Sequence, residues 1–219
     1  MSDARTEPSL RVTEIFLSLQ GEALSAGCPT VFVRLTGCPL RCRYCDTEYA
    51  FSGGRRMTLD EIVAVVRDYG VRPVCVTGGE PLAQKGCLTL LERLASLDFD
   101  VSLETSGALD ISGVDKRVST VMDLKTPGSG ESHRNRWENL DHLGASDQVK
   151  FVIRDETDYQ WAREVVRSRR LDQICTVLFS PTQPDLAPTT LADWIVADRL
   201  PVRFQVQLHK LLWGDQPGR

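Results

Sequence analysis

The stretch TVFVRLTGCPLRCRYC, residues 30–45, decides the fold. Its first six residues, TVFVRL, are mostly β-branched or apolar, which predicts a strand that ends near Gly37. Three cysteines follow that strand within eight residues. Reactive side chains at the carboxyl end of a strand are typical of α/β folds, in which the site lies at that edge of the sheet.

Short β-branched runs alternate with helical patterns along the rest of the chain, which predicts βαβ units and a parallel sheet. We expect strands at 30–35, 73–77, 100–104, 118–124, 148–153, 174–179 and 202–208. A capping box formed by Thr58 and Glu61 predicts the start of a helix that closes at Gly70. Further helices are expected at 87–97, 157–169 and 190–199, with at most a short one at 137–143.

The length of the chain limits the architecture. A barrel of eight complete βα units takes about 250 residues, and this chain has 219. No repeat or linker divides it, so residues 1–219 are expected to form a single domain. We therefore predict an α/β fold, a partial, abbreviated TIM-type (β/α) barrel of about six to seven parallel strands, with the site at their carboxyl ends.

Charge and hydropathy narrow the possible partners. Twenty-six basic residues against 30 acidic ones give a net charge of −4, which argues against binding to nucleic acid or to an anionic membrane. No apolar run approaches the ~20 residues of a membrane span. The opening MSDARTEPSLR has no apolar signal core, and a cytoplasmic protein is expected.

Cys38, Cys42 and Cys45 form the pattern C-x3-C-x2-C. Three thiolates on one loop can bind three irons of a cubane that ordinarily takes four cysteines, which leaves one iron open to an outside ligand. The alternative is a zinc site, with a distant fourth ligand from His133, His142 or His209. Zinc loops more often pair two C-x2-C units, and a second pair is absent here. The other four cysteines are expected to pack as small buried or half-buried side chains: Cys28, Cys75, Cys87 and Cys175.

The cysteine pattern, with Tyr44 as the aromatic residue before the third cysteine, and the turn TGGEP at 77–81 resemble the radical S-adenosylmethionine (SAM) superfamily. The resemblance implies a [4Fe-4S] cluster whose open iron binds the amino and carboxylate groups of SAM. One electron from the cluster then cleaves SAM to a 5′-deoxyadenosyl radical, so no side chain is expected to act as a catalytic acid or base. By the same resemblance, SAM contacts fall on Tyr44, Cys45, Asp46, Gly79, Glu80, Glu104, Asp123, Lys125 and Ser180.

Each of these segments also has a structural interpretation. The GGEP turn is equally typical of a strand-to-helix connection with Pro81 at the helix start. The ETSG segment at 104–107 could be a polar strand end, and Asp123 and Lys125 could form a surface salt bridge.

Three further segments narrow the resemblance: IFLSLQGEA at 15–23, the CDT of 45–47 and QLHKLLW at 207–213. Together they resemble the 7-carboxy-7-deazaguanine synthases of queuosine biosynthesis. The resemblance implies a carbon–nitrogen lyase that converts 6-carboxy-5,6,7,8-tetrahydropterin to 7-carboxy-7-deazaguanine. Hydrogen is taken from C6, the ring contracts and ammonia leaves.

That resemblance also implies the ligands of substrate and magnesium. Thr47 corresponds to the Mg²⁺-binding threonine, and the substrate-binding residues are Leu19, Gln20, Gly21, Glu22, Arg34, Thr77 and His209. Gln and Glu can pair with the ring of a pterin, and Arg can hold its carboxylate bidentately. The alternatives are a local turn hydroxyl for Thr47, a surface charge for Arg34 and a structural imidazole for His209.

Two other functions remain open at this stage: a glycyl-radical enzyme activase, which shares the cysteine loop, and a non-catalytic zinc-binding module. The activase would act on a large protein substrate, whereas the zinc-binding module would have no substrate. As partners, the resemblance implies a flavodoxin-type electron donor and a homodimer.

Overall fold

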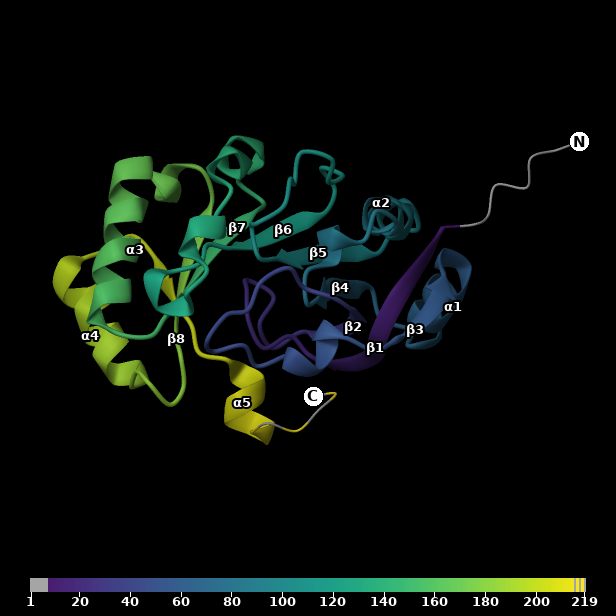
Figure 1. The fold of residues 1–219 in the computed structure, drawn as a ribbon, viewed down its shortest axis with the longest axis horizontal. Coiled ribbons are helices and arrows are strands. Elements are labelled where there is room, and N and C mark those ends of the chain that lie inside the picture. Colours follow the sequence, from purple (N-terminus) through teal and green to yellow (C-terminus); the bar gives the residue numbers. More distant parts are fainter. Residues whose placement is uncertain (1–7, 215, 217, 219) are drawn as a thin grey trace, which may run out of the picture.

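The computed structural model describes residues 8–214, 216 and 218. Residues 1–7, within the opening segment used for the cytoplasmic prediction, and 215, 217 and 219 of the terminal GDQPGR lie outside the described residues. The described strands form one sheet in the order β3-β1-β2-β4-β5-β6-β7-β8-β9 (Figure 1). They span Ser9–Leu19 (β1), Pro29–Leu35 (β2), Arg55–Thr58 (β3), Pro73–Gly78 (β4), Asp100–Thr105 (β5), Ser119–Asp123 (β6), Gln148–Ile153 (β7), Thr176–Pro181 (β8) and Arg203–Phe204 (β9).

The strands from β2 to β9, β3 excepted, run parallel, whereas β1 pairs antiparallel with both β2 and β3. The edge strands β3 and β9 are not paired with each other in the described sheet, so the barrel stays open. This confirms the predicted partial TIM-type barrel. The carboxyl ends of the parallel strands meet at one edge of the sheet, where the cysteine loop follows β2.

The described helices are α1 (Leu59–Asp68), α2 (Cys87–Ser96), α3 (Glu156–Arg169), α4 (Pro188–Asp198) and α5 (Leu208–Trp213). The first four agree closely with the sequence prediction, whereas α5 was not predicted. Figure 1 shows α3 and α4 at one end of the molecule and α1 at the other. Within the described part of the chain, none of the helices has the length and apolar character to cross a bilayer. Between β5 and β6 there is no helix, as expected from the short spacing.

Two apolar clusters pack the helices against the sheet. One joins α1 and α2 to the strands from β1 to β5, through side chains such as Ile62 and Leu91. The other joins α3 and α4 to the later strands, through side chains such as Val166, Leu191 and Phe179. Because the helices occupy the outer face, the polar residues at the strand ends are left to face a common cavity.

Three expectations need correction. Strands β1 and β3 were not predicted, because β1 mixes polar and apolar residues, is half-buried over much of its length and carries a register shift between Val12 and Glu14. The predicted last strand at 202–208 is only Arg203–Phe204, since it is an edge strand and the chain turns there towards α5. Cys28 is exposed, because it lies in the turn before β2, whereas Cys75, Cys87 and Cys175 are buried as expected.

The capping box gives a direct test of local stability. The Thr58 hydroxyl accepts a hydrogen bond from the Glu61 amide, and the Glu61 carboxylate accepts one from the Thr58 amide. We predict that Thr58→Ala lowers the free energy of unfolding by about 1 kcal/mol in urea denaturation. Thr89→Ala, on the exposed face of α2, is the matched control and should not destabilise, because alanine favours a helix. Equal stability of Thr58→Ala and wild type would contradict the capping role.

Candidate active site

A cavity of about 400 Å³ opens at the carboxyl ends of the parallel strands. It gathers side chains from segments far apart in the sequence, including the cysteine loop, the strand ends and the start of α5. The predicted site residues that line it are Leu19, Gln20, Gly21, Glu22, Arg34, Cys38, Cys42, Tyr44, Cys45, Asp46, Thr47, Thr77, Gly79, Glu104, Asp123, Lys125 and His209. Glu80 and Ser180 are buried and are not among the residues that line the cavity.

The end of β4 supports the first cysteine from one side. A Cβ at Gly79 would overlap the carbonyl oxygen of Gly37, and it would also contact Cys38. The Glu80 amide donates to the same Gly37 oxygen at 2.8 Å. The paired glycines of the GGEP turn therefore allow this strand end to lie directly against the start of the cysteine loop.

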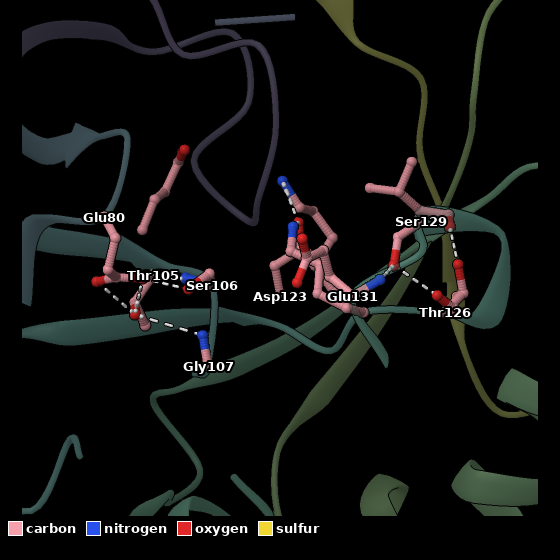
Figure 2. A network of polar contacts seen from close by, with 12 residues as sticks. Glu80, Thr105, Ser106, Gly107, Asp123, Thr126, Ser129 and Glu131 are labelled. Carbon is pink, nitrogen blue, oxygen red and sulfur yellow. Dashed lines mark hydrogen bonds and ion pairs between the residues drawn. The ribbon is translucent and has the colours of Figure 1, made fainter. Parts of the chain in front are cut away.

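The segment after β6 supports the same loop from the other side. The amide of Arg41 donates to Glu131 Oε1 at 2.8 Å, and the amide of Arg43 donates to the carbonyl oxygen of Ser129 at 3.0 Å. The Ser129 hydroxyl in turn accepts from the Glu131 amide and donates to the carbonyl oxygen of Thr126 (Figure 2). The backbone between the cysteines is thus held by residues about 90 positions away in the chain.

The three cysteines suit a cluster better than a single metal ion. All three thiols are free, line the cavity and are half-buried. Among the described residues, no three His, Cys, Asp or Glu side chains are close enough to hold one metal ion. Thiolates that bind three separate irons of a cubane need not converge on one point, whereas zinc ligands must. Burial raises the pKa of these thiols, that of Cys42 to about 11, so binding of iron would release their protons.

Glu80 connects the ends of two strands through its carboxylate. Its carboxylate lies between β4 and β5, where it accepts hydrogen bonds from the Thr105 hydroxyl at 2.9 Å and the Ser106 amide at 2.7 Å (Figure 2). It also accepts from the Leu82 amide at 3.0 Å. This fully buried carboxylate joins the ends of two neighbouring strands, and a contact with SAM stays a prediction.

Asp123 and Lys125 form an ion pair inside the cavity rather than on the surface. Lys125 Nζ lies 2.8 Å from Asp123 Oδ2, and the two side chains are 11% and 14% exposed. Although burial opposes the charge, Asp123 holds the pKa of Lys125 above its usual range. Asp123 Oδ1 and the hydroxyl of Thr182 are buried without a hydrogen-bond partner in the structure. Such unpaired groups facing a cavity are expected to bind a polar ligand, and they fit the amino-acid and ribose groups of SAM.

The LQGE segment crosses the cavity from β1. Gln20 Nε2 donates to Glu104 Oε1 at 3.2 Å, and the Thr77 hydroxyl donates to the other oxygen of Glu104 at 3.3 Å. A Cβ at Gly21 would overlap the ring of His209, so a glycine is required for the imidazole to lie against this segment. This contact brings together the two predicted substrate segments, LQGE and QLHK, which lie far apart in the sequence.

Arg34 lines the cavity, and a carboxylate holds the Nε of its guanidinium group. Its Nε donates to Glu14 Oε1 at 2.8 Å, and the same oxygen accepts from the Tyr49 hydroxyl. The guanidinium also lies 5.9 Å from the ring centre of Phe16. Because the Arg34 side chain is only 16% exposed, it is not a surface charge, and its terminal nitrogens remain for an anionic ligand.

Thr47 and Asp46 lie where the cysteine loop meets the start of α5. The Thr47 hydroxyl donates to Asp46 Oδ1 at 2.8 Å, as in the predicted local turn bond. The other oxygen of Asp46 lies 3.2 Å from Gln207 Nε2 and 3.4 Å from Lys210 Nζ. A single hydroxyl with water and substrate oxygens fits Mg²⁺, which keeps several waters and is bound by few protein groups.

Sequence reasoning missed several polar residues that line the cavity: Tyr49, Thr105, Ser106, Lys150, Thr182, Gln207 and Lys210. Lys150 had a recognisable signal, because it is a lone charge inside the otherwise apolar strand QVKFVI. Gln207 lay in a quoted segment, yet its pairing with Asp46 joins positions 161 apart and could not be inferred from spacing.

Comparison with known proteins gives concordant results. The model of the radical SAM superfamily matches residues 32–174. A 7-carboxy-7-deazaguanine synthase from Chlorobaculum tepidum is 43% identical, over 95% of this chain and 96% of its own length. One from Koribacter versatilis is 42% identical, over 94% and 98%. The crystal structure of QueE from Escherichia coli shares the fold, with a TM-score of 0.76 and 21% identity, over 92% of this chain and 95% of that one.

The fold, the cysteine loop and the matched model define a radical SAM enzyme, whose cofactors are a [4Fe-4S] cluster and SAM. Within that superfamily, the chain belongs to the 7-carboxy-7-deazaguanine synthases, Mg²⁺-dependent lyases, by its identity to relatives over nearly its whole length.

The contact between Glu131 and the cysteine loop gives a test of cluster binding. We predict that Glu131→Ala loses iron several-fold faster than wild type during anaerobic dialysis, because the Arg41 amide loses its acceptor. Glu131→Gln keeps an acceptor oxygen and should retain most of the iron. Glu48→Ala removes an exposed carboxylate near the cysteine loop and is the control. Iron content and the electron paramagnetic resonance signal of the reduced cluster are the measurements, and equal retention in all variants would contradict the bracing role.

Proposed function

We propose that this enzyme converts 6-carboxy-5,6,7,8-tetrahydropterin to 7-carboxy-7-deazaguanine with loss of ammonia, as a step of queuosine biosynthesis. The observation that carries the proposal is that one cavity contains both the cysteine loop and the substrate residues implied by the family. Three separate segments reach it: the LQGE segment with Gln20 and Glu22, β2 with Arg34 and α5 with His209. The names of the full-length relatives support the same reaction.

The side chains of the cavity match the chemistry of a pterin carboxylic acid. Glu22 and Gln20 offer oxygen acceptors and an amide to the donors and acceptors of the ring. The free nitrogens of Arg34 can bind the carboxylate bidentately, and Thr47 lies in the same cavity to hold Mg²⁺ beside it. The buried lysines Lys125 and Lys150 offset the acidic groups, so a negatively charged substrate is not repelled.

The cofactors define the remaining roles. Cys38, Cys42 and Cys45 would hold the cluster, while Asp123, Lys125 and Thr182 face the space beside them, with polar groups for SAM. When bound, the cluster and SAM supply a radical that takes hydrogen from the substrate at C6. The protein positions the substrate and excludes water, and apolar side chains such as Phe16, Leu40 and Val121 line the cavity for this purpose.

The two other hypotheses are less consistent with this site. An activase would need a surface for a large protein, whereas the substrate residues line a cavity of small-molecule size. A structural zinc site would close four ligands around the metal, whereas the three cysteines line an open cavity. The matched relatives are named for the deazaguanine reaction.

The substrate is a small molecule, as the enzyme family indicates. Beyond that, we propose that residues 1–219 act as a single domain, since one sheet extends from Ser9 to Phe204. We also propose a flavodoxin-type electron donor, a homodimer and a cytoplasmic location, on the family resemblance.

Turnover of the proposed substrate tests the function. Reconstituted, reduced enzyme incubated with SAM, Mg²⁺ and the carboxypterin should yield the deazaguanine acid and ammonia, with 5′-deoxyadenosine as the transient carrier of the hydrogen from C6. Omission of Mg²⁺ should slow the reaction. Absence of product from enzyme with an intact cluster, measured by liquid chromatography with mass detection, would reject the assignment.

The cluster itself is tested by Cys42→Ala. We predict loss of SAM cleavage and of the brown cluster absorption, because one iron loses its ligand. The circular dichroism spectrum should be unchanged, since Cys42 lies on a loop outside the apolar clusters. A colourless wild type with stoichiometric zinc would instead support the zinc module.

A further inference from the structure

Lys150 is a buried cation that lines the cavity, and neither the sequence pattern nor the family resemblance assigns it a role. It lies on β7, its side chain is 11% exposed, and its Nζ lies 2.5 Å from Glu22 Oε2. Asp123 Oδ2 is 3.9 Å from the same nitrogen. A lysine buried among carboxylates is strongly oriented by them, so its position is part of the site.

The second oxygen of Glu22 is held from the opposite direction. Gln207 Nε2, just before α5, donates to Glu22 Oε1 at 2.8 Å. The Glu22 carboxylate is therefore held between β7 and the chain leading into α5. Each carboxylate oxygen has two lone pairs, so both oxygens keep acceptor capacity for a ligand after these contacts.

The backbone around Glu22 is fixed by glutamine side chains. The Glu22 amide donates to Gln20 Oε1, the Ala23 amide donates to Gln205 Oε1, and the Leu24 amide donates to Gln148 Oε1 at 2.8 Å. These bonds hold the backbone of the segment independently of Lys150. Loss of the lysine is therefore expected to disturb the carboxylate more than the path of the chain.

The same contacts shift the pKa values of Glu22 and Lys150. Although burial opposes both charges, Lys150 holds the pKa of Glu22 below its usual range, and Glu22 holds the pKa of Lys150 well above its own. The other charged groups around the pair are Asp46 on the cysteine loop, Glu104 on β5 and Asp123 on β6. Lys210 and His209 of α5 line the same cavity. Without Lys150, a buried Glu22 would face like charges and would take up a proton more readily.

We propose that Lys150 is a positioning residue that holds the Glu22 carboxylate as the acceptor for the N–H groups of the pterin ring, with Gln207 as the second support. The inference rests on the proposed function, because it concerns the substrate site of that reaction. Lys150 acts through Glu22 and not through SAM: it lies 2.5 Å from Glu22, whereas Asp123 is 3.9 Å away and has its own partner in Lys125.

The test compares Lys150→Met, Lys150→Arg and the exposed control Lys85→Met, each in the reconstituted enzyme. Lys150→Met should raise the KM for the carboxypterin at least about tenfold, while the Kd for SAM and the iron content stay unchanged. Its kcat/KM should fall at acid pH and recover as the pH rises, because the unpaired Glu22 becomes ionised only at higher pH. Lys150→Arg should restore part of the loss, and Lys85→Met should match wild type.

A double-mutant cycle separates this role from a general structural one. In the Glu22→Gln background, Lys150→Met should have little further effect on KM, because the group through which it acts is gone. The double variant also removes both buried charges and so keeps the measurement possible if Lys150→Met alone folds poorly. Additive effects, or a change in the Kd for SAM with an unchanged KM for the carboxypterin, would overturn the inference.

Equilibrium binding of the carboxypterin distinguishes failure of the proposed function from failure of the role proposed for Lys150. Wild-type enzyme with SAM that fails to bind the carboxypterin would refute the proposed function. Wild-type enzyme that binds and turns over the carboxypterin, while Lys150→Met does so with the same KM and pH profile, would refute only the role of Lys150.

Discussion

A buried ion pair between Lys150 and Glu22 connects the two sides of an open sheet, and the proposed substrate site is built around it. Glu22 comes from the loop after β1, near one edge of the sheet, whereas Lys150 comes from β7, near the other. A complete barrel would bring these elements together by closure, which the sheet of the described residues does not show. Removal of one partner from a buried pair leaves an uncompensated charge and costs about 3–5 kcal/mol, so the two residues are expected to act as a unit.

The cysteine loop is held by a separate set of contacts. The GGEP turn lies against its first cysteine, and the backbone amides between the cysteines donate to Ser129 and Glu131. Gln207 joins the predicted substrate residues to the cysteine loop, because it donates to both Glu22 and Asp46. Asp46 lies between Cys45, a predicted cluster ligand, and Thr47, the predicted Mg²⁺ ligand. The side-chain amide of Gln207 therefore connects Glu22 to both of these positions.

The sequence allowed the parallel core to be predicted because its strands are β-branched runs that end in polar motifs, as TVFVRL does before the cysteines. The start of α1 followed from the Thr58 and Glu61 side chains for the same local reason. Strands β1 and β3 were missed, since their pairing is antiparallel and half-exposed and leaves no continuous apolar run.

Long-range polar contacts could not be predicted from spacing. Lys150 pairs with a residue 128 positions away, and Glu80 joins two strand ends through a hydrogen bond from Thr105 that its motif did not indicate. Burial of a charge is set by the tertiary fold, which a local pattern does not encode. The motifs therefore indicated which segments contribute to the site. Which charged side chains pair with each other inside it could be seen only in the structure.

We propose that the cavity holds the carboxypterin with C6 next to the radical source. A single turnover with substrate deuterated at C6 follows the hydrogen transfer between them. Because substrate and product differ only by ammonia, the rearranged radical must take a hydrogen atom back from 5′-deoxyadenosine. Deuterium is therefore expected at the 5′ carbon of the adenosyl group, in 5′-deoxyadenosine or in re-formed SAM. Product formed while the adenosyl group stays unlabelled would rule out hydrogen transfer from C6.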